Sequence, residues 1–377
     1  MDKRDEIIRT QLDVIGTLIN NNIRRMSDDL WGSPAPSKSA KVENVQKAEV
    51  EPVKHAEEKE EAETPPENIE DLKVELNELI GLEGIKREVN NLINMVTIHN
   101  LRKQNGLKTV DMSLHMVFSG NPGTGKTTIA RLMSRIYKSL GVLSKGHLVE
   151  VDRSGLVAGY VGQTATKTSE VIQKAMGGVL FIDEAYALTA GKADNDFGQE
   201  AVDTILKAME DNREDLVVIV AGYDGLMDEF IHSNPGLESR FNRYLHFDDY
   251  TTDEMLAILD LQLKKGQYQL DEAAREAVRD YIVDANTGSI AFGNARGVRN
   301  IFERLLVAQA NRLAECSELT KDALMTIIED DVVAAKNSDD KLMKALKERE
   351  EHEAAAKQAL DELQRLSDEI KARNNDQ

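Results

Sequence analysis

The sequence predicts an α/β fold with a parallel sheet, followed by a smaller helical domain. Three observations lead to this prediction. Between residues 68 and 250, short apolar runs alternate with helix-like segments, as in a parallel sheet covered by helices. A glycine-rich loop follows the first of these runs and opens a helix. After residue 250 the strand-like runs stop, and residues 251–335 show helical periodicity only.

The composition indicates a globular protein with charged extensions, because 41% of the 377 residues are hydrophobic and 30% are charged. The single cysteine, Cys316, excludes an internal disulfide framework. No apolar run reaches the roughly 18 residues of a membrane span, and the first ten residues lack the apolar core of a signal peptide. We therefore expect a cytoplasmic protein without a membrane partner. The net charge of −20 disfavours a nucleic-acid partner, since an acidic chain is repelled by phosphates.

Two segments precede the α/β domain. Residues 1–31 predict an amphipathic helix, because apolar residues recur at spacings of three and four between Ile8 and Leu30. Its apolar face would pack on the main body, on a second copy of the chain or on a partner. Residues 32–67 contain five of the seven prolines and many acidic residues, which predicts a disordered acidic linker.

The α/β domain is expected over residues 68–250 and contains five strand candidates. These are residues 115–120, 147–151, 179–183, 216–222 and 244–247. The helical domain is expected over residues 251–335. Residues 336–377 predict a charged helix whose apolar heptads are interrupted at Arg349, Glu353 and Ser367, so that a coiled coil and a solvated helix both fit.

Residues 120–127 read GNPGTGKT, which matches the phosphate-binding pattern G-x-x-x-x-G-K-[ST]. Backbone N–H groups of such a loop surround phosphates, with help from the positive end of the following helix. Lys126 would reach the β- and γ-phosphates, and the Thr127 hydroxyl would bind Mg²⁺. The predicted nucleotide-binding residues here are Gly120, Asn121, Pro122, Gly123, Thr124, Gly125, Lys126, Thr127 and Thr128.

The second motif, VLFIDEAY at residues 179–186, is an apolar strand that ends in two acidic residues. Asp183 would complete the Mg²⁺ shell, and Glu184 would orient and deprotonate the attacking water. A pair of exposed loop acids is the less favoured alternative. The glutamate predicts hydrolysis of the nucleotide rather than binding alone.

These motifs, followed by NPGLESRFNRYLHFDDY (234–250) and GNARGVRN (293–300), resemble the AAA+ ATPases. The phrases ELIGLEGIK (78–86) and GYVGQTATKT (159–168) resemble the branch that contains stage V sporulation protein K and the CbbX/CfxQ group of red-type Rubisco activases. The resemblance covers about residues 72–335. It implies a P-loop NTPase sheet with a small C-terminal helical lid, to which this chain adds N-terminal and C-terminal helical extensions.

The resemblance also implies roles for single residues. Arg240 would be the arginine finger that reaches the nucleotide of a neighbouring subunit, with Arg243 as the alternative. Arg296 would contact the same phosphate from the lid of its own subunit. Ile80 and Gly81 would surround the adenine. Where many family members place a water-orienting Asn or Thr, this chain has Tyr223 and Asp224, and neither is assigned that role.

Tyr160 lies in a glycine-rich stretch after the second strand candidate. From the residues alone a packed core tyrosine is the simpler interpretation. The resemblance instead implies a loop that faces the central channel of a ring and grips a polypeptide with Tyr160, Val161 and Gly162. Residues 190–198 would form a second ring around that channel.

Together these features predict an ATP- and Mg²⁺-dependent ATPase that assembles as a homohexamer and pulls on an unidentified client protein. Two alternatives stay open at this point. One is a scaffold whose assembly is controlled by nucleotide binding. The other, disfavoured by the acidic charge, is a motor that acts on nucleic acid.

Overall fold

The computed structural model describes residues 67–341, apart from 111, 161, 191–196, 287–291 and 317–318, and a few positions between 344 and 357. The predicted helix over residues 1–31, nearly all of the predicted linker and most of the predicted C-terminal helix lie outside the described residues. The chain divides into two units, and the unit considered below spans Glu61–Asn337.

Five parallel strands form a sheet in the order β2-β3-β4-β1-β5. Their bounds are Met116–Gly120 (β1), Leu148–Val151 (β2), Val179–Ile182 (β3), Val217–Gly222 (β4) and Tyr244–Phe247 (β5). Each of the five apolar runs singled out in the sequence is one of these strands. The predicted α/β fold with a parallel sheet is thus confirmed.

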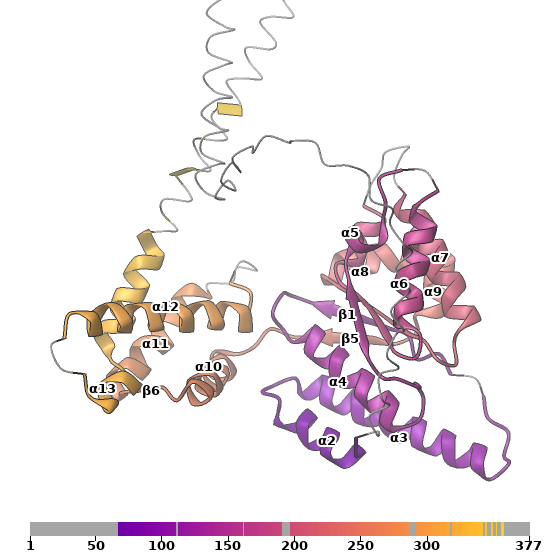
Figure 1. Cartoon of the computed structure of the whole chain (residues 1–377), viewed down its shortest axis with the longest axis horizontal. Coiled ribbons are helices and arrows are strands. Elements are labelled where there is room, and N and C mark those ends of the chain that lie inside the picture. Colours follow the sequence, from indigo (N-terminus) through magenta and orange to yellow (C-terminus); the bar gives the residue numbers. More distant parts are fainter. Residues whose placement is uncertain are drawn as a thin grey trace, which may run out of the picture. The chain divides into compact units, whose positions relative to one another are not determined.

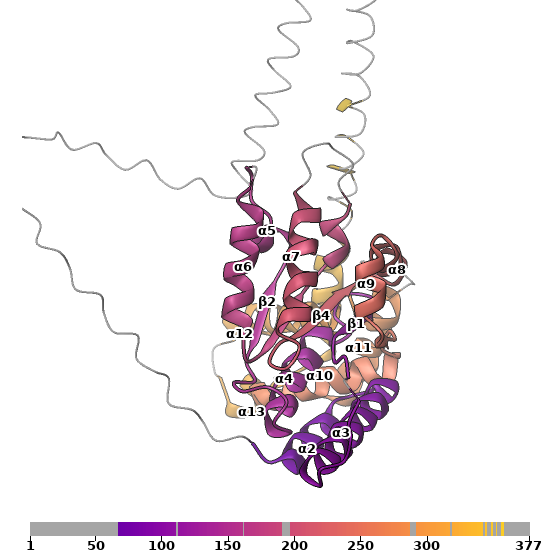
Figure 2. The same cartoon turned by 90° about the vertical axis from the view of Figure 1, so that its right-hand side faces the viewer.

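Helices cover both faces of the sheet (Figures 1 and 2). One layer consists of α2 (Ile69–Glu78), α3 (Glu83–Gln104) and α4 (Lys126–Ser139). The other consists of α6 (Thr164–Ala175), α7 (Gly198–Asp211), α8 (Asp224–His232) and α9 (Pro235–Arg240). Because both faces are covered, every residue of β3 and β4 is buried. Alternate strand residues enter the two cores, for example Phe118 on the α2–α4 side and Val117 on the other.

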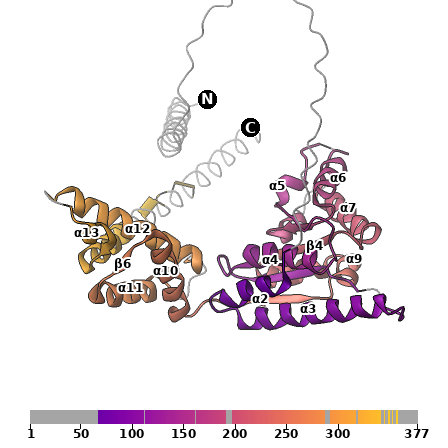
Figure 3. The same ribbon diagram turned by 60° about the horizontal axis from the view of Figure 1, so that its bottom comes forward.

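The two N-terminal helices of the described chain lie side by side on the α4 layer, as Figure 3 shows. Arg135 on α4 binds the α2 segment. Its Nη1 donates to Glu75 on α2 at 2.8 Å, and its Nε donates to Glu67, just before α2, at 2.8 Å. The segment after α2 is thereby held near the carboxyl ends of the strands.

The lid that follows the sheet is mainly helical. It contains α10 (Thr252–Gly266), α11 (Glu272–Ala285), α12 (Ala295–Ala314) and α13 (Lys321–Met325), and residues 329–341 are also helical. A capping box starts α10, in which Thr251 and Glu254 satisfy each other's backbone N–H groups. Apolar residues of these helices form a separate core.

The expectation of helices alone after residue 250 was wrong in one detail. Two-residue strands, β6 (Gln269–Leu270) and β7 (Thr326–Ile327), pair in parallel within the lid. A strand of two residues has no periodicity that a sequence pattern could reveal. Within the described part of the chain, no helix combines the length and apolar character needed to cross a membrane.

Candidate nucleotide-binding site

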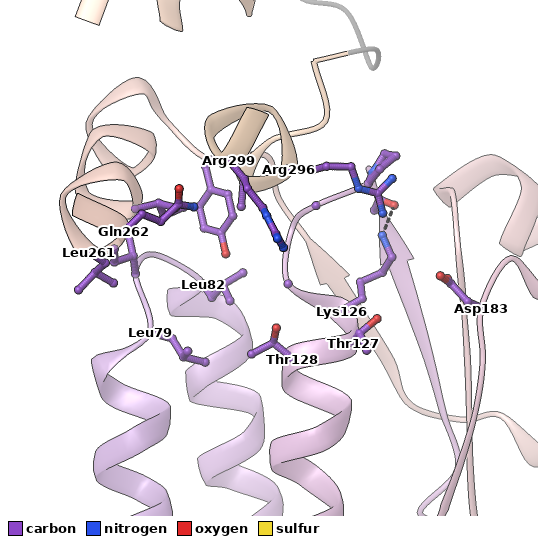
Figure 4. A pocket seen from close by; sticks show the side chains of 18 of the residues that line it. Leu79, Leu82, Lys126, Thr127, Thr128, Asp183, Leu261, Gln262, Arg296 and Arg299 are labelled. Atoms are coloured by element: carbon purple, nitrogen blue, oxygen red, sulfur yellow. Dashed lines mark hydrogen bonds between the residues drawn. The ribbon is translucent and has the colours of Figure 1, made fainter. Parts of the chain in front are cut away.

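A cavity of about 620 Å³ lies at the carboxyl ends of the central strands (Figure 4). Its walls come from the β1–α4 loop, the segment between α2 and α3, the ends of β3 and β4, and lid helices α10 and α12. Many residues predicted from the sequence line it together: Ile80, Gly120, Pro122, Gly123, Gly125, Lys126, Thr127, Thr128, Asp183, Glu184 and Arg296.

The β1–α4 loop has the backbone of a phosphate-binding loop. Gly123 and Gly125 adopt φ values of 73° and 98°, which favour glycine. Helix α4 begins at Lys126, so the N–H groups of its first turn are free of intrahelical partners. They provide positive partial charge for an anion at the cavity wall.

Lys126 points back along the same loop. Its Nζ donates to the carbonyl oxygens of Gly120 at 2.8 Å and Asn121 at 2.7 Å. A dashed line at Lys126 in Figure 4 marks the first of these hydrogen bonds. Burial lowers the pKa of Lys126, and the carboxylates of Asp183, Asp224 and Asp249 oppose that change.

Two predicted loop residues do not line the cavity but shape the loop. The buried Thr124 hydroxyl donates to the carbonyl oxygen of Asn121 at 2.8 Å. The Asn121 amide in turn donates to both carboxylate oxygens of Asp249, at 3.0 and 2.9 Å. Asp249 was not singled out in the sequence, because it lies 128 residues further along the chain.

The acidic wall of the cavity follows β3. The backbone N–H of Asp183 donates to Val151 at 2.8 Å, which fixes the strand end. Glu184 adopts φ 48° and ψ 42°, a left-handed conformation that costs a non-glycine residue about 1–3 kcal/mol. Strain of this kind is concentrated at functional sites.

The oxygen donors of Thr127 and Asp183 suit Mg²⁺, which prefers hydroxyl, carboxylate, phosphate and water oxygens. Among the described residues, no group of three or more His, Cys, Asp or Glu side chains could hold a metal ion. A Mg²⁺ ion that binds together with a nucleotide typically has only a few protein ligands, because phosphates and water supply the others.

The opposite wall is largely apolar and suits an adenine ring. It consists of Leu79, Ile80, Leu82, Tyr250, Ile258 and Leu261. Gly81 itself does not line the cavity; its φ is 62°, and a Cβ there would overlap the Glu254 carboxylate. Burial raises the pKa of Tyr250 to about 12, and its hydroxyl donates to the Thr124 carbonyl oxygen at 3.3 Å.

Two arginines of α12 line the cavity. Figure 4 shows Arg296 and Arg299 on the lid side, facing the β1–α4 loop. Arg296 was predicted from the sequence and Arg299 was not. The spacing of three residues places both arginines on one face of the helix, which is the signal that could have identified Arg299.

The other two arginines lie elsewhere. Arg240 ends α9, where its Nη2 is 3.4 Å from the Glu210 carboxylate and its buried Nε has no hydrogen-bond partner. Arg243 is held within its own domain, because its Nε donates to the carbonyl oxygen of Ser113 at 3.1 Å. Neither side chain lines the cavity.

Tyr160 lies in the loop between α5 (Arg153–Leu156) and α6, and 74% of its surface is exposed. The interpretation as a packed core tyrosine was therefore wrong. Gly162 has a φ of 77° and open space around it, whereas Val161 and residues 191–196 of the second predicted loop lie outside the described residues.

The two residues at the predicted water-orienting position differ in placement. Tyr223 lines the cavity, and its ring centroid is 6.1 Å from that of Tyr186. Asp224 begins α8, and its Oδ1 lies 2.8 Å from Nδ1 of the His246 imidazole.

Comparisons with known proteins agree with these features. The model of the ATPase family associated with various cellular activities (AAA) matches residues 116–249, and that of the AAA lid domain matches residues 251–342. Stage V sporulation protein K of Bacillus subtilis is 42% identical over 266 residues, which are 70% of this chain and 82% of that protein. The chromosomal CbxX protein of Cupriavidus necator is 45% identical over 261 residues (69% and 82%). The chloroplastic ribulose bisphosphate carboxylase/oxygenase activase of Cyanidioschyzon merolae is 44% identical over 261 residues (69% and 89%).

Proposed function

Because the chain belongs to the AAA family of ATPases, it binds and hydrolyses ATP, and we propose that it uses this activity as a homohexamer to pull a client polypeptide through a central channel. The observation that carries the proposal is the exposed Tyr160 on an anchored, glycine-flanked loop. An aromatic ring without a packing partner is suited to contact with another chain.

Hydrolysis is assigned to the residues that line the cavity. Lys126 and the α4 N-terminus bind the phosphates, and Arg296 contacts the terminal phosphate from the lid. Mg²⁺, held by Thr127 and Asp183, would neutralise charge on the phosphates. Glu184 orients the attacking water and accepts its proton. The products are ADP and inorganic phosphate.

Arg240 is assigned to the nucleotide of the neighbouring subunit. Its side chain lies outside the cavity of its own subunit and is 30% exposed. A guanidinium delivered from a neighbour would stabilise the charge of the transition state, so that hydrolysis depends on assembly. Arg243 remains the alternative, because both arginines have contacts in their own domain: Arg240 with Glu210, and Arg243 with Ser113 and Met95.

The structure of the Tyr160 loop supports the pulling role. The amino-terminal stem of the loop is bound to α6 twice: the Ala158 N–H donates to the Thr164 hydroxyl at 3.0 Å, and Lys167 donates to the Val157 carbonyl oxygen at 3.0 Å. The glycines on either side of Tyr160 have open space where a side chain would be. A firm base with a free tip allows the ring to move without disturbing the domain.

Two alternatives are weaker. A scaffold would need nucleotide binding without turnover, yet Glu184, the residue assigned to the attacking water, lines the cavity. A motor acting on nucleic acid would have to overcome a net charge of −20.

The test is steady-state ATPase activity measured across protein concentrations. We expect the specific activity of the wild type to rise cooperatively with concentration, because each site needs the Arg240 of a neighbour. Arg240→Ala and Glu184→Gln should each lower kcat by about 100-fold or more. Mixing the two variants should restore part of the activity, since mixed rings contain sites with both groups intact.

Arg279→Ala in the lid is the matched control, because its side chain is exposed and pairs only with Asp253 among the contacts described. It should keep wild-type activity and concentration dependence. Turnover that is independent of concentration, without recovery on mixing, would refute both the ring and the pulling role of Tyr160.

A further inference from the structure

Asn294, at the start of lid helix α12, has an unusual backbone conformation. Its φ is 52° and its ψ is −125°, a combination that normally belongs to glycine, and only 6% of its surface is exposed. Such a conformation persists only where surrounding contacts enforce it. The Asn294 side chain supplies those contacts.

The amide of Asn294 bonds to the end of the sheet domain with both of its functional groups. Its Oδ1 accepts the backbone N–H of Tyr250 at 3.0 Å. Its Nδ2 donates to Oδ1 of Asp249 at 2.7 Å and lies 3.3 Å from the carbonyl oxygen of Pro122 in the phosphate loop. Asn294 therefore contacts both the segment that joins β5 to α10, which we call the hinge, and the phosphate loop.

Asp249 extends this contact to a third residue. The Oδ1 atom that accepts from Asn294 also accepts from Asn121 of the phosphate loop, as does Oδ2. We refer to Asn121, Asp249 and Asn294 as the clasp. One carboxylate thus receives amide donors from the phosphate loop and from the lid.

Backbone contacts tighten the same junction. The Ala295 N–H, next to the clasp, donates to the carbonyl oxygen of Gly123 at 3.2 Å. A Cβ on Gly123 would overlap the Gly293 carbonyl oxygen, so the loop and the lid approach each other closely here. Arg296 follows one residue later and lines the cavity.

We propose that Asn294 is a positioning residue of the ATPase, which acts through the clasp to hold the start of α12 on the phosphate loop and so places Arg296 at the nucleotide. The proposal extends the role proposed above for Arg296. It gives the phosphate loop a direct connection to the lid, because any displacement of Asn121 or Pro122 is transmitted through Asp249 and Asn294.

Asparagine fits this position for a chemical reason. The site requires an acceptor for Tyr250 N–H and a donor for the Asp249 carboxylate within one short side chain. Aspartate offers the acceptor but places a second carboxylate against Asp249. Glycine accepts the backbone conformation but removes both bonds.

The first experiment is a double-mutant cycle on kcat/KM for ATP with Asn294→Gly and Arg296→Ala. Glycine tolerates the backbone conformation, so the lid should stay folded while the clasp is lost. We expect each single variant to lower kcat/KM by roughly tenfold or more, and the double variant to match Arg296→Ala within about twofold, as residues acting through one another do. Asn286→Gly, at the end of α11 in the same lid, is the matched control and should remain like wild type.

The second experiment exchanges the partners. Asn294→Asp should lower kcat/KM because two carboxylates then face each other. Adding Asp249→Asn should restore most of the activity, since an amide at position 249 donates to the new carboxylate and still accepts from Asn121. The melting temperature of each variant is measured as well. If Asn294 were needed only for folding, kcat/KM would follow the melting temperature, and the exchange could not restore kcat/KM without restoring stability.

The outcomes separate the two proposals. Additive losses in the cycle, or a swap that fails to recover activity, would overturn the clasp. Wild-type kcat/KM for Asn294→Gly beside a slow Arg296→Ala would overturn the clasp alone and leave the role of Arg296 intact. Wild-type kcat/KM for Arg296→Ala would overturn both.

Discussion

At the amino end of β1, the buried His115 connects the neighbouring strands β1 and β4. Nδ1 of His115 accepts the backbone N–H of Val218 on the β4 side at 3.0 Å, and only 5% of the residue is exposed. Burial lowers the pKa of His115 to about 4, although a hydrogen bond with the Met209 backbone opposes the shift. The imidazole is therefore neutral in the folded protein at pH values where an unfolded histidine is already charged.

This difference predicts a loss of stability in mild acid. As the pH falls from 6.5 towards 4, the unfolded chain takes up a proton at His115 and the folded chain does not, so the free energy of unfolding decreases. The total contribution is about 3 kcal/mol. His115→Gln, whose amide oxygen still accepts from Val218, should remove this part of the pH dependence in urea unfolding series between pH 7 and 4.5.

An equal slope in His115→Gln and wild type would show that His115 takes up its proton in the folded state as readily as in the unfolded state.

At the scale of elements, the five strands were predictable to within one residue at each end. Their apolar runs are short, and those of β3 and β4 are rich in β-branched residues and fully buried, so the pattern and the burial agree there. The phosphate loop was predictable for a similar reason, because its whole motif is contiguous in the chain. The two-residue strands of the lid left no such pattern.

Apart from Ile80, the apolar wall of the site was not predicted from the sequence. Tyr250, Ile258 and Leu261 belong to the hinge and to α10, where their spacing suggests only a helix with a buried face. Leu79 and Leu82 lie far from them in the sequence, and only folding brings the two groups together at the cavity. The clasp was missed for the same reason, since Asn121 was predicted only as part of the phosphate motif and Asp249 looks like an ordinary polar loop residue.

The final helical segment of the lid yields a prediction about buried charge. Arg312 near the end of α12 donates to both carboxylate oxygens of Asp331, at 2.8 and 2.9 Å, and Asp331 is 2% exposed. Arg312→Met should lower the free energy of unfolding by about 3 kcal/mol, because it leaves a buried carboxylate without its cation. Thermal or urea unfolding measures the effect.

An exposed bidentate pair in the same lid, Arg275 with Asp260, is the matched control. Arg275→Met should cost less than about 1 kcal/mol, because both partners remain accessible to water. Equal losses for the two variants would mean that burial of Asp331 does not determine the effect.

At the scale of the whole molecule, the proposed motor makes a prediction that requires no client. Cys316 is the sole cysteine of the chain and is exposed, so Cys316→Ser with Tyr160→Cys allows one environment-sensitive fluorophore at the loop tip. Its emission should differ between ADP and a slowly hydrolysed ATP analogue, and only at protein concentrations where activity is cooperative. The physical reason is that the free tip moves with nucleotide state inside an assembled ring.

The matched probe is Val74→Cys on the exposed face of α2, also in the Cys316→Ser background. Its emission should not depend on the nucleotide. A Tyr160 probe that responds equally in dilute, inactive protein would separate the movement of the loop from assembly.

The strand order has a consequence for synthesis of the protein. β1 is made first, yet its neighbours in the sheet are β4 and β5, and His115 bonds to Val218 at a sequence separation of 103. A nascent chain that has not reached residue 216 therefore carries the β1 strand, with its apolar residues, without either neighbour. Non-local pairing of this kind slows folding and exposes the chain to aggregation. The ribosome must release nearly the whole domain before the phosphate loop acquires its support, so translation that stops early yields a chain with the motif but without the site.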